Sequence, residues 1–228
     1  MSSDQIAQLA IWFPAFLLSI TLHEAAHAFV AVWGGDDTPA EQASLNPIPH
    51  VAREPVGTIL APLLSFFAFG YTLGWASAPY DRLWADRHPR RAALMSLAGP
   101  LANFLLAGLA LGALHALLAA GVLHLNPGKF GFTTVVLPAS DGVMGFVAQF
   151  LSVTFLLNLL LGCFNLIPLP PLDGSGVIQG LLPNTAIGKG LAMLEERGWS
   201  MIGLLLAWLI FPKTLPWIWA LVQLSLGL

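Results

Sequence analysis

Five consecutive residues near the N-terminus, HEAAH at 23–27, have side chains that could bind a metal ion and transfer a proton. His23, Glu24 and His27 form the pattern H-E-x-x-H within a long apolar segment. If this segment is a helix, residues four apart lie on one face, so both imidazoles can reach a single metal ion. Two imidazoles suit zinc, and Glu24 beside them can act as general base on a water bound to the metal. Two packed histidines with a solvated glutamate are the weaker interpretation, because an ionisable cluster is expensive at membrane depth.

A catalytic zinc site needs a third protein ligand, and Asp173 is the acidic residue whose surroundings set it apart. It follows the segment 165–172, NLIPLPPL, and precedes Gly174. Three prolines must break a helix there, and backbone freed at membrane depth is tolerated where it lines a cavity or is buried in protein. The carboxylate could therefore approach the two histidines. An aspartate that caps a helix or forms an Asp-Gly turn at the membrane surface is the other interpretation, and the residues leave both open.

The elements that position these groups must be membrane helices. Of 228 residues, 57% are hydrophobic and 9% are charged, whereas about 25% are charged in soluble domains. Because 9% of charged residues is too few to cover the surface of a soluble protein, the chain needs lipid as its solvent. The predicted fold class is all-α, a polytopic transmembrane helical protein of four to six membrane segments, with residues 1–228 forming one domain. The expected apolar segments are 6–33, 56–75, 92–122, 142–166, 201–211 and 216–228.

Composition also excludes several classes of protein. A net charge of −3 provides no basic surface, so nucleic acid is not an expected partner. The single cysteine, Cys163, cannot form a disulfide within the chain. The expected partners are the lipid bilayer and a transmembrane protein or peptide substrate, and nothing in the sequence indicates an oligomeric state.

A parity argument predicts the topology. For the ends of segments 6–33 and 142–166 to share a metal, both must cross in the same direction, so one apolar segment between them should not cross. Segment 56–75, with its proline and glycine breaks, is the one we expect to be re-entrant. The alternative is that 56–75 crosses the membrane and 92–122 forms two half-spans. The loop 77–91 contains four arginines and the loop 123–141 only Lys129, which places the first loop in the cytoplasm. The active site is then expected near the cytoplasmic side of a multi-pass cell-membrane protein.

Taken together, these motifs resemble the site-2 protease family of intramembrane zinc metalloproteases, peptidase family M50. That family pairs an H-E-x-x-H helix with an N-x-x-P-x-P-x-L-D-G-like segment, which here is 165–174. Residues 98–103, AGPLAN, are similar to a further family segment. The resemblance covers about residues 20–185, and it implies that His23, His27 and Asp173 bind one Zn²⁺ per chain. It also implies that Glu24 is the catalytic acid and base and that Asn165 stabilises the oxyanion or positions the substrate.

Two other functions compete with the protease. An ion-binding transporter with broken helices would suit segments 56–75 and 167–174, but the chain has no internal repeat. A non-catalytic metal-binding scaffold would not need Glu24. Asn103 lies among small residues that allow helices to approach closely, so its segment is interpreted mainly as a packing surface. His115 and His124 are expected to be structural and His88 to be a polar residue at the membrane interface, and His50 is given no catalytic role.

Overall fold

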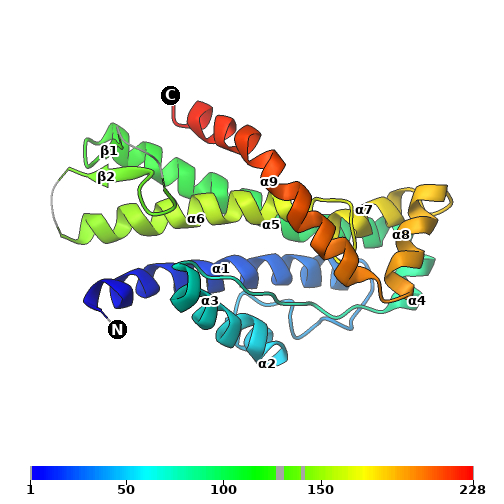
Figure 1. The fold of residues 1–228 in the computed structure, drawn as a ribbon. Helices are drawn as coiled ribbons and strands as arrows, with labels where there is room; N and C mark the ends of the chain where they lie inside the picture. The colour runs from blue at the N-terminus through cyan, green and yellow to red at the C-terminus, as the bar shows by residue number, and fades with distance from the viewer. Residues whose placement is uncertain (1, 127–130, 140–141, 228) are drawn as a thin grey trace. The chain divides into compact units, whose positions relative to one another are not determined.

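The computed structural model describes residues 2–126, 131–139 and 142–227, and this part of the chain is predominantly α-helical. Four helices are long and apolar enough to cross a membrane: α1 (Ser3–Trp33), α5 (Pro89–Ala119), α6 (Val143–Asn165) and α9 (Ser200–Ser225) (Figure 1). The prediction of a polytopic all-α membrane protein is confirmed. Lys129 and Asp141 lie outside the described residues.

The exposure of the long helices fits a lipid environment. In α5 and α9 only 22% and 17% of the most apolar window is buried inside the protein. Large side chains such as Leu105, Leu109 and Trp217 are more than 60% exposed. Helices that are apolar all round and bury so little against protein need hydrocarbon as their solvent.

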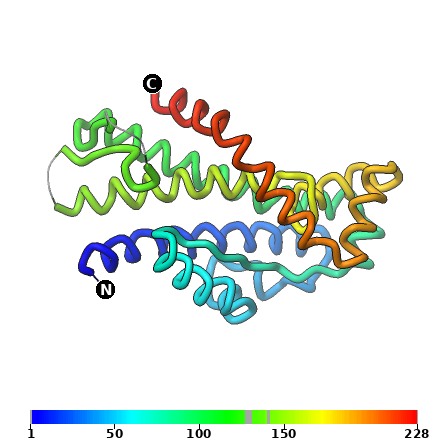
Figure 2. Tube along the Cα trace, in the orientation of Figure 1, coloured from blue at the N-terminus to red at the C-terminus, as the bar shows by residue number. Residues whose placement is uncertain are grey.

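The expected segment 56–75 is shorter and more broken than the sequence predicts. Helix α2 (Pro47–Arg53) is followed by the π-helical turn η1 (Val56–Leu60) and by α3 (Ala61–Phe69), with a bend of 109° between α2 and the residues after it. Gly70 ends α3 in the left-handed region, with φ +83°, where glycine has no steric penalty. The chain then runs without helix or strand to α4 (Arg82–Arg87), as the teal trace in Figure 2 shows. This bend is that of a broken span or of a re-entrant loop, so re-entry stays a prediction.

Two predictions about secondary structure are corrected. Segments 201–211 and 216–228 are not separate, because α9 continues through Pro212 and Pro216. A proline removes one backbone donor, and membrane helices tolerate this because other groups satisfy the freed carbonyl. Part of the loop 123–141 forms a short antiparallel hairpin of β1 (Leu123–Leu125) and β2 (Val136–Pro138), in which Leu123 is opposite Pro138.

The chain divides into two compact units, each built from three stretches of sequence. The first comprises Met1–Ala25, Ser44–Ala78 and Ala102–Leu159, and its core includes Trp12, Phe66 and Val153. The second comprises Ala26–Ala43, Pro79–Leu101 and Leu160–Leu228, which includes α7 (Asp173–Leu181) and α8 (Ala186–Glu196). In this unit Trp84 packs with Ala31 and Met95. The prediction of one domain over 1–228 is not tested by this division.

Candidate metal centre and active site

The H-E-x-x-H residues lie on α1, as the spacing predicts. His23, Glu24 and His27 are 8%, 7% and 8% exposed. The helix is continuous from Ser3 to Trp33, so the two histidines are one turn apart on the same face. Three ionisable groups are therefore buried in a helix of membrane length.

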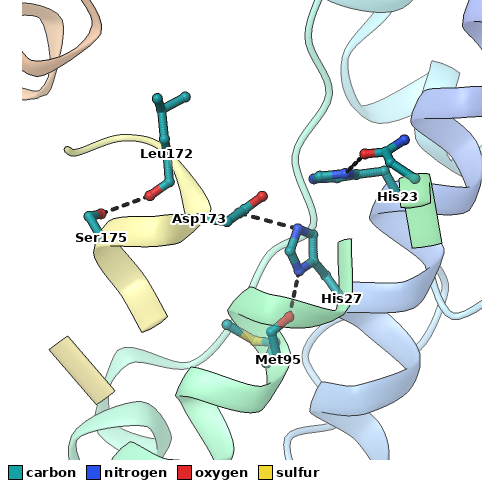
Figure 3. Close-up of polar contacts among 7 residues, drawn as sticks. His23, His27, Met95, Leu172, Asp173 and Ser175 are labelled. Atoms are coloured by element: carbon teal, nitrogen blue, oxygen red, sulfur yellow. Dashed lines mark hydrogen bonds and ion pairs between the residues drawn. The ribbon is translucent and has the colours of Figure 1, made fainter. Parts of the chain in front are cut away.

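His27 lies between α5 and the start of α7, and it has a partner on each ring nitrogen. Its Nδ1 lies 2.7 Å from the backbone oxygen of Met95. Its Nε2 lies 3.3 Å from Oδ1 of Asp173, which points toward the ring in Figure 3. Residues that are far apart in the sequence are thus brought together as the motifs predict.

Tight packing fixes the position of Asp173 at the start of α7. A Cβ on Gly176 would lie 2.4 Å from Oγ of Ser96, and one on Gly180 would lie 2.3 Å from the backbone oxygen of Pro89. Glycines four apart thus let α7 approach the first turns of α5 more closely than any side chain would permit. The N-cap position of α7 is Leu172, so Asp173 is the first helical residue and its carboxylate faces His27.

His23 is held by a residue whose sequence context predicts only packing. Its Nδ1 lies 2.6 Å from Oδ1 of Asn103, which is 1% exposed on α5. The interpretation of the Asn103 segment as mainly a packing surface is therefore wrong for this side chain. An asparagine within an apolar helix was the available signal, because polar side chains at membrane depth usually have a specific partner.

The donor set fits a zinc ion. A carbonyl oxygen only accepts hydrogen bonds, so Nδ1 of His27 carries a proton, and in the neutral form of the ring Nε2 has the lone pair. That lone pair faces a carboxylate oxygen at 3.3 Å, and two acceptors face one another favourably only with a cation or a proton between them. His23, His27 and Asp173 each offer one ligand atom, and this combination of nitrogen and oxygen ligands is typical of zinc. Second partners on Nδ1 are also typical of zinc-binding histidines.

The remaining expected residues are placed less directly. Asn165 is the last residue of α6 and is half-buried. Among the described residues, the contacts of Nδ1 of His23 and of His27 are made with Asn103 and Met95, not with Asn165. His50 is buried, and its Nε2 lies 3.0 Å from the backbone oxygen of Ser44, which agrees with a structural role. His88 contacts the backbone oxygen of Trp84 through Nδ1.

Comparison with known proteins identifies the class. A buried H-E-x-x-H motif on a membrane-length helix is what a zinc metalloprotease of the membrane requires. Peptidase family M50 matches residues 12–210, and the chain belongs to this family.

Several relatives carry the name of a zinc metalloprotease. The chain is 37% identical to YwhC of Bacillus subtilis over 73% of its own length and 67% of that protein. It is 29% identical to Rip2 of Mycolicibacterium smegmatis and 30% identical to Rip2 of Mycobacterium tuberculosis, in each case over 91% of this chain and 69% of the relative. No solved structure matches the chain.

Proposed function

We propose that this zinc metalloprotease hydrolyses peptide bonds within or near the transmembrane segments of membrane-protein substrates. The observation that carries the proposal is the contact of His27 with Asp173 of α7 at 3.3 Å, because His27 lies on the membrane-length helix α1 that also carries Glu24. A site buried among apolar helices admits a substrate that is itself stable in lipid. Family membership favours this function over the ion transporter and the non-catalytic scaffold.

In this proposal His23, His27 and Asp173 hold one zinc ion per chain. When bound, zinc lowers the pKa of a water molecule toward neutrality and polarises the carbonyl of the scissile bond. The buried contacts of both imidazoles to Asn103 and to the Met95 carbonyl orient the rings for this purpose.

The side chains of this protein move the proton and stabilise the charge. Glu24 takes a proton from the attacking water and delivers it to the leaving amine, a role that typically contributes a factor of about 10² to 10⁴ in rate. The side-chain amide of Asn165 donates a hydrogen bond to the carbonyl oxygen as it gains negative charge, an interaction worth about 3 kcal/mol where it is well aligned.

The charges around α4 support a cytoplasmic position for this chemistry. Arg82 and Arg87 lie on α4, and Arg90 and Arg91 lie in the first turn of α5. Positively charged loops tend to stay in the cytoplasm, which favours a cytoplasmic position for the end of α1 and the start of α5. We accordingly propose that the active site opens nearer the cytoplasmic side of the cell membrane.

The test is cleavage of a synthetic transmembrane peptide by purified protein in detergent. Glu24→Gln should lower kcat/KM at least about 100-fold while the bound zinc is unchanged, because only the base is lost. Glu196→Gln, at an exposed position on α8, is the matched control and should leave the rate unchanged. Cleavage that survives Glu24→Gln would refute the proposal.

The ligand set is tested separately. Asp173→Ala should reduce the zinc bound per chain after dialysis, as measured by atomic emission. A zinc content equal to that of the unmodified protein would remove Asp173 from the ligands.

A further inference from the structure

We infer that Asn158 and Ser19 are positioning residues that fix which nitrogen of His23 binds metal, acting through the side chain of Asn103. The inference rests on the proposed role of His23 as a zinc ligand. It concerns the first compact unit alone, where α1, α5 and α6 each contribute to a buried polar chain.

The polar chain consists of short hydrogen bonds between fully buried groups. Nδ1 of His23 lies 2.6 Å from Oδ1 of Asn103, and Nδ2 of Asn103 lies 2.8 Å from Oδ1 of Asn158. Nδ2 of Asn158 in turn lies 2.8 Å from Oγ of Ser19. Ser19, Asn103 and Asn158 are at most 1% exposed, so bulk water does not compete for these bonds.

Two backbone carbonyl groups, which can only accept hydrogen bonds, determine which groups of the polar chain donate and which accept. Nδ2 of Asn158 donates to the backbone oxygen of Thr154 at 2.8 Å, so the NH₂ end of this amide must face that carbonyl. The Ser19 hydroxyl donates to the backbone oxygen of Ala15 at 2.6 Å, which leaves its oxygen to accept from Asn158. Both neighbours therefore require the same orientation of the Asn158 amide.

The orientation of the Asn158 amide determines that of the Asn103 amide, which in turn determines which nitrogen of His23 carries the proton. Because Asn158 presents its oxygen, Asn103 must present its NH₂ end to Asn158 and its oxygen to the imidazole. An oxygen at 2.6 Å holds the proton of His23 on Nδ1, so Nε2 keeps the lone pair that a metal needs. A reversed Asn103 amide would place a donor against Nδ1 and favour the proton on Nε2, which could not then bind the metal.

Asn103 has only a weak preference of its own for this orientation. Within the part of the chain that the structure describes, the other contact that orients its amide is from Nδ2 to the backbone oxygen of Ser19 at 3.5 Å, which is long for a hydrogen bond. The oxygen and nitrogen of an asparagine side chain have almost the same size, so packing alone does not choose between the two orientations. The choice is made by the hydrogen bonds of Asn158.

The first test reads the tautomer of His23 without metal or substrate. Nitrogen-15 NMR of the histidine-labelled, zinc-free full-length protein, at a pH where the ring is neutral, should show a protonated Nδ1 and an unprotonated Nε2. The His23 signals are assigned from their loss in His23→Gln. A predominantly Nε2-protonated ring in the unmodified protein would overturn the inference, whether or not any variant folds.

The second test measures zinc affinity by competition with a chromophoric chelator. Asn158→Leu should weaken zinc binding about 10- to 100-fold, the range found when outer partners of metal ligands are removed. Ser152→Ala is the matched control, because Ser152 is equally buried on α6 and donates to the backbone oxygen of Ala148 at 2.7 Å, outside the polar chain. It should leave zinc affinity unchanged.

A rescue distinguishes positioning from a structural defect. In the Asn158→Leu background, Asn103→Asp should restore most of the zinc affinity, because a carboxylate accepts from Nδ1 of His23 in either orientation. Unchanged affinity in Asn158→Leu, or failure of this rescue, would overturn the inference. If the unmodified protein itself did not bind zinc, the proposed function would fail instead. The same NMR measurement on Asn158→Leu would then test the role of Asn158, because this variant should lose the preference for a protonated Nδ1 on His23.

Discussion

Gly174 tests whether the position of Asp173 depends on close backbone packing at the start of α7. A Cβ at this position would lie 2.2 Å from the backbone oxygen of Leu166 and 2.7 Å from that of Ile167. Because real Cβ atoms stay at least 3.0 Å from such neighbours, Gly174→Ala requires the two segments to separate by about 0.8 Å. The obstacles are backbone atoms, so rotation of a side chain cannot relieve them.

Two effects of different size follow from that displacement. Overpacking of this kind costs about 1 to 3 kcal/mol in the free energy of unfolding. The displaced residue is adjacent to Asp173, and a misplacement of about 1 Å can reduce the rate about 100-fold. We therefore expect Gly174→Ala to fold, to bind zinc more weakly and to have a kcat/KM reduced by about 10- to 100-fold.

The assay combines peptide cleavage, zinc content and thermal unfolding in detergent. Gly190→Ala on α8 is the control, because a Cβ at that position would have no heavy atom within 4 Å outside its own helix backbone and its chain neighbours. Alanine is favoured over glycine in a helix by about 0.5 to 1 kcal/mol, so this variant should be fully active and slightly more stable. A Gly174→Ala protein whose cleavage and zinc binding equal those of the unmodified protein would refute the reasoning.

Three further predictions concern pH, metal and topology. Burial alone would raise the pKa of Asp36, but hydrogen bonds from Thr38 and from the backbone N–H of Asp81 outweigh it and lower that pKa. Because the pKa of Asp36 is lower in the folded state, its carboxylate stabilises the fold at pH values above the unfolded-state pKa of about 3.9, and this stabilisation is lost as the pH falls through the folded-state pKa. Asp36→Asn should therefore reduce the dependence of the thermal midpoint on acid pH. An equal dependence in both proteins would contradict this prediction. Removal of metal with a chelator should abolish cleavage and lower the thermal midpoint. Zinc added at about 100 times its Kd should restore about 2.7 kcal/mol in the free energy of unfolding. Cleavage that persists in metal-free protein would contradict the zinc mechanism. In a Cys163→Ala background, an impermeant thiol reagent added to intact cells should label Thr133→Cys but not Asp86→Cys, and labelling of both would disprove the proposed topology.

The local chemistry of the site could be predicted from the sequence. The spacing in H-E-x-x-H alone places His23 and His27 on one helical face, because an α-helix repeats every 3.6 residues. Low charge identified the membrane, and the prolines before Asp173 predicted a helix break within 165–172; the structure ends α6 at Asn165. These are consequences of backbone geometry and solvent, which act on neighbouring residues.

The tertiary structure decided which distant groups meet. Asn103 is 80 residues after His23, and its contact depends on how α5 packs, so composition indicated only a packing role for it. The continuity of α9 through two prolines and the hairpin of β1 and β2 were likewise missed, because both depend on partners outside the local sequence. The sequence by itself determined which chemistry this protein can perform and in which solvent. Only long-range packing, through close glycine contacts and directed buried hydrogen bonds, decided how Asp173 faces His27 and which nitrogen of His23 faces Asn103.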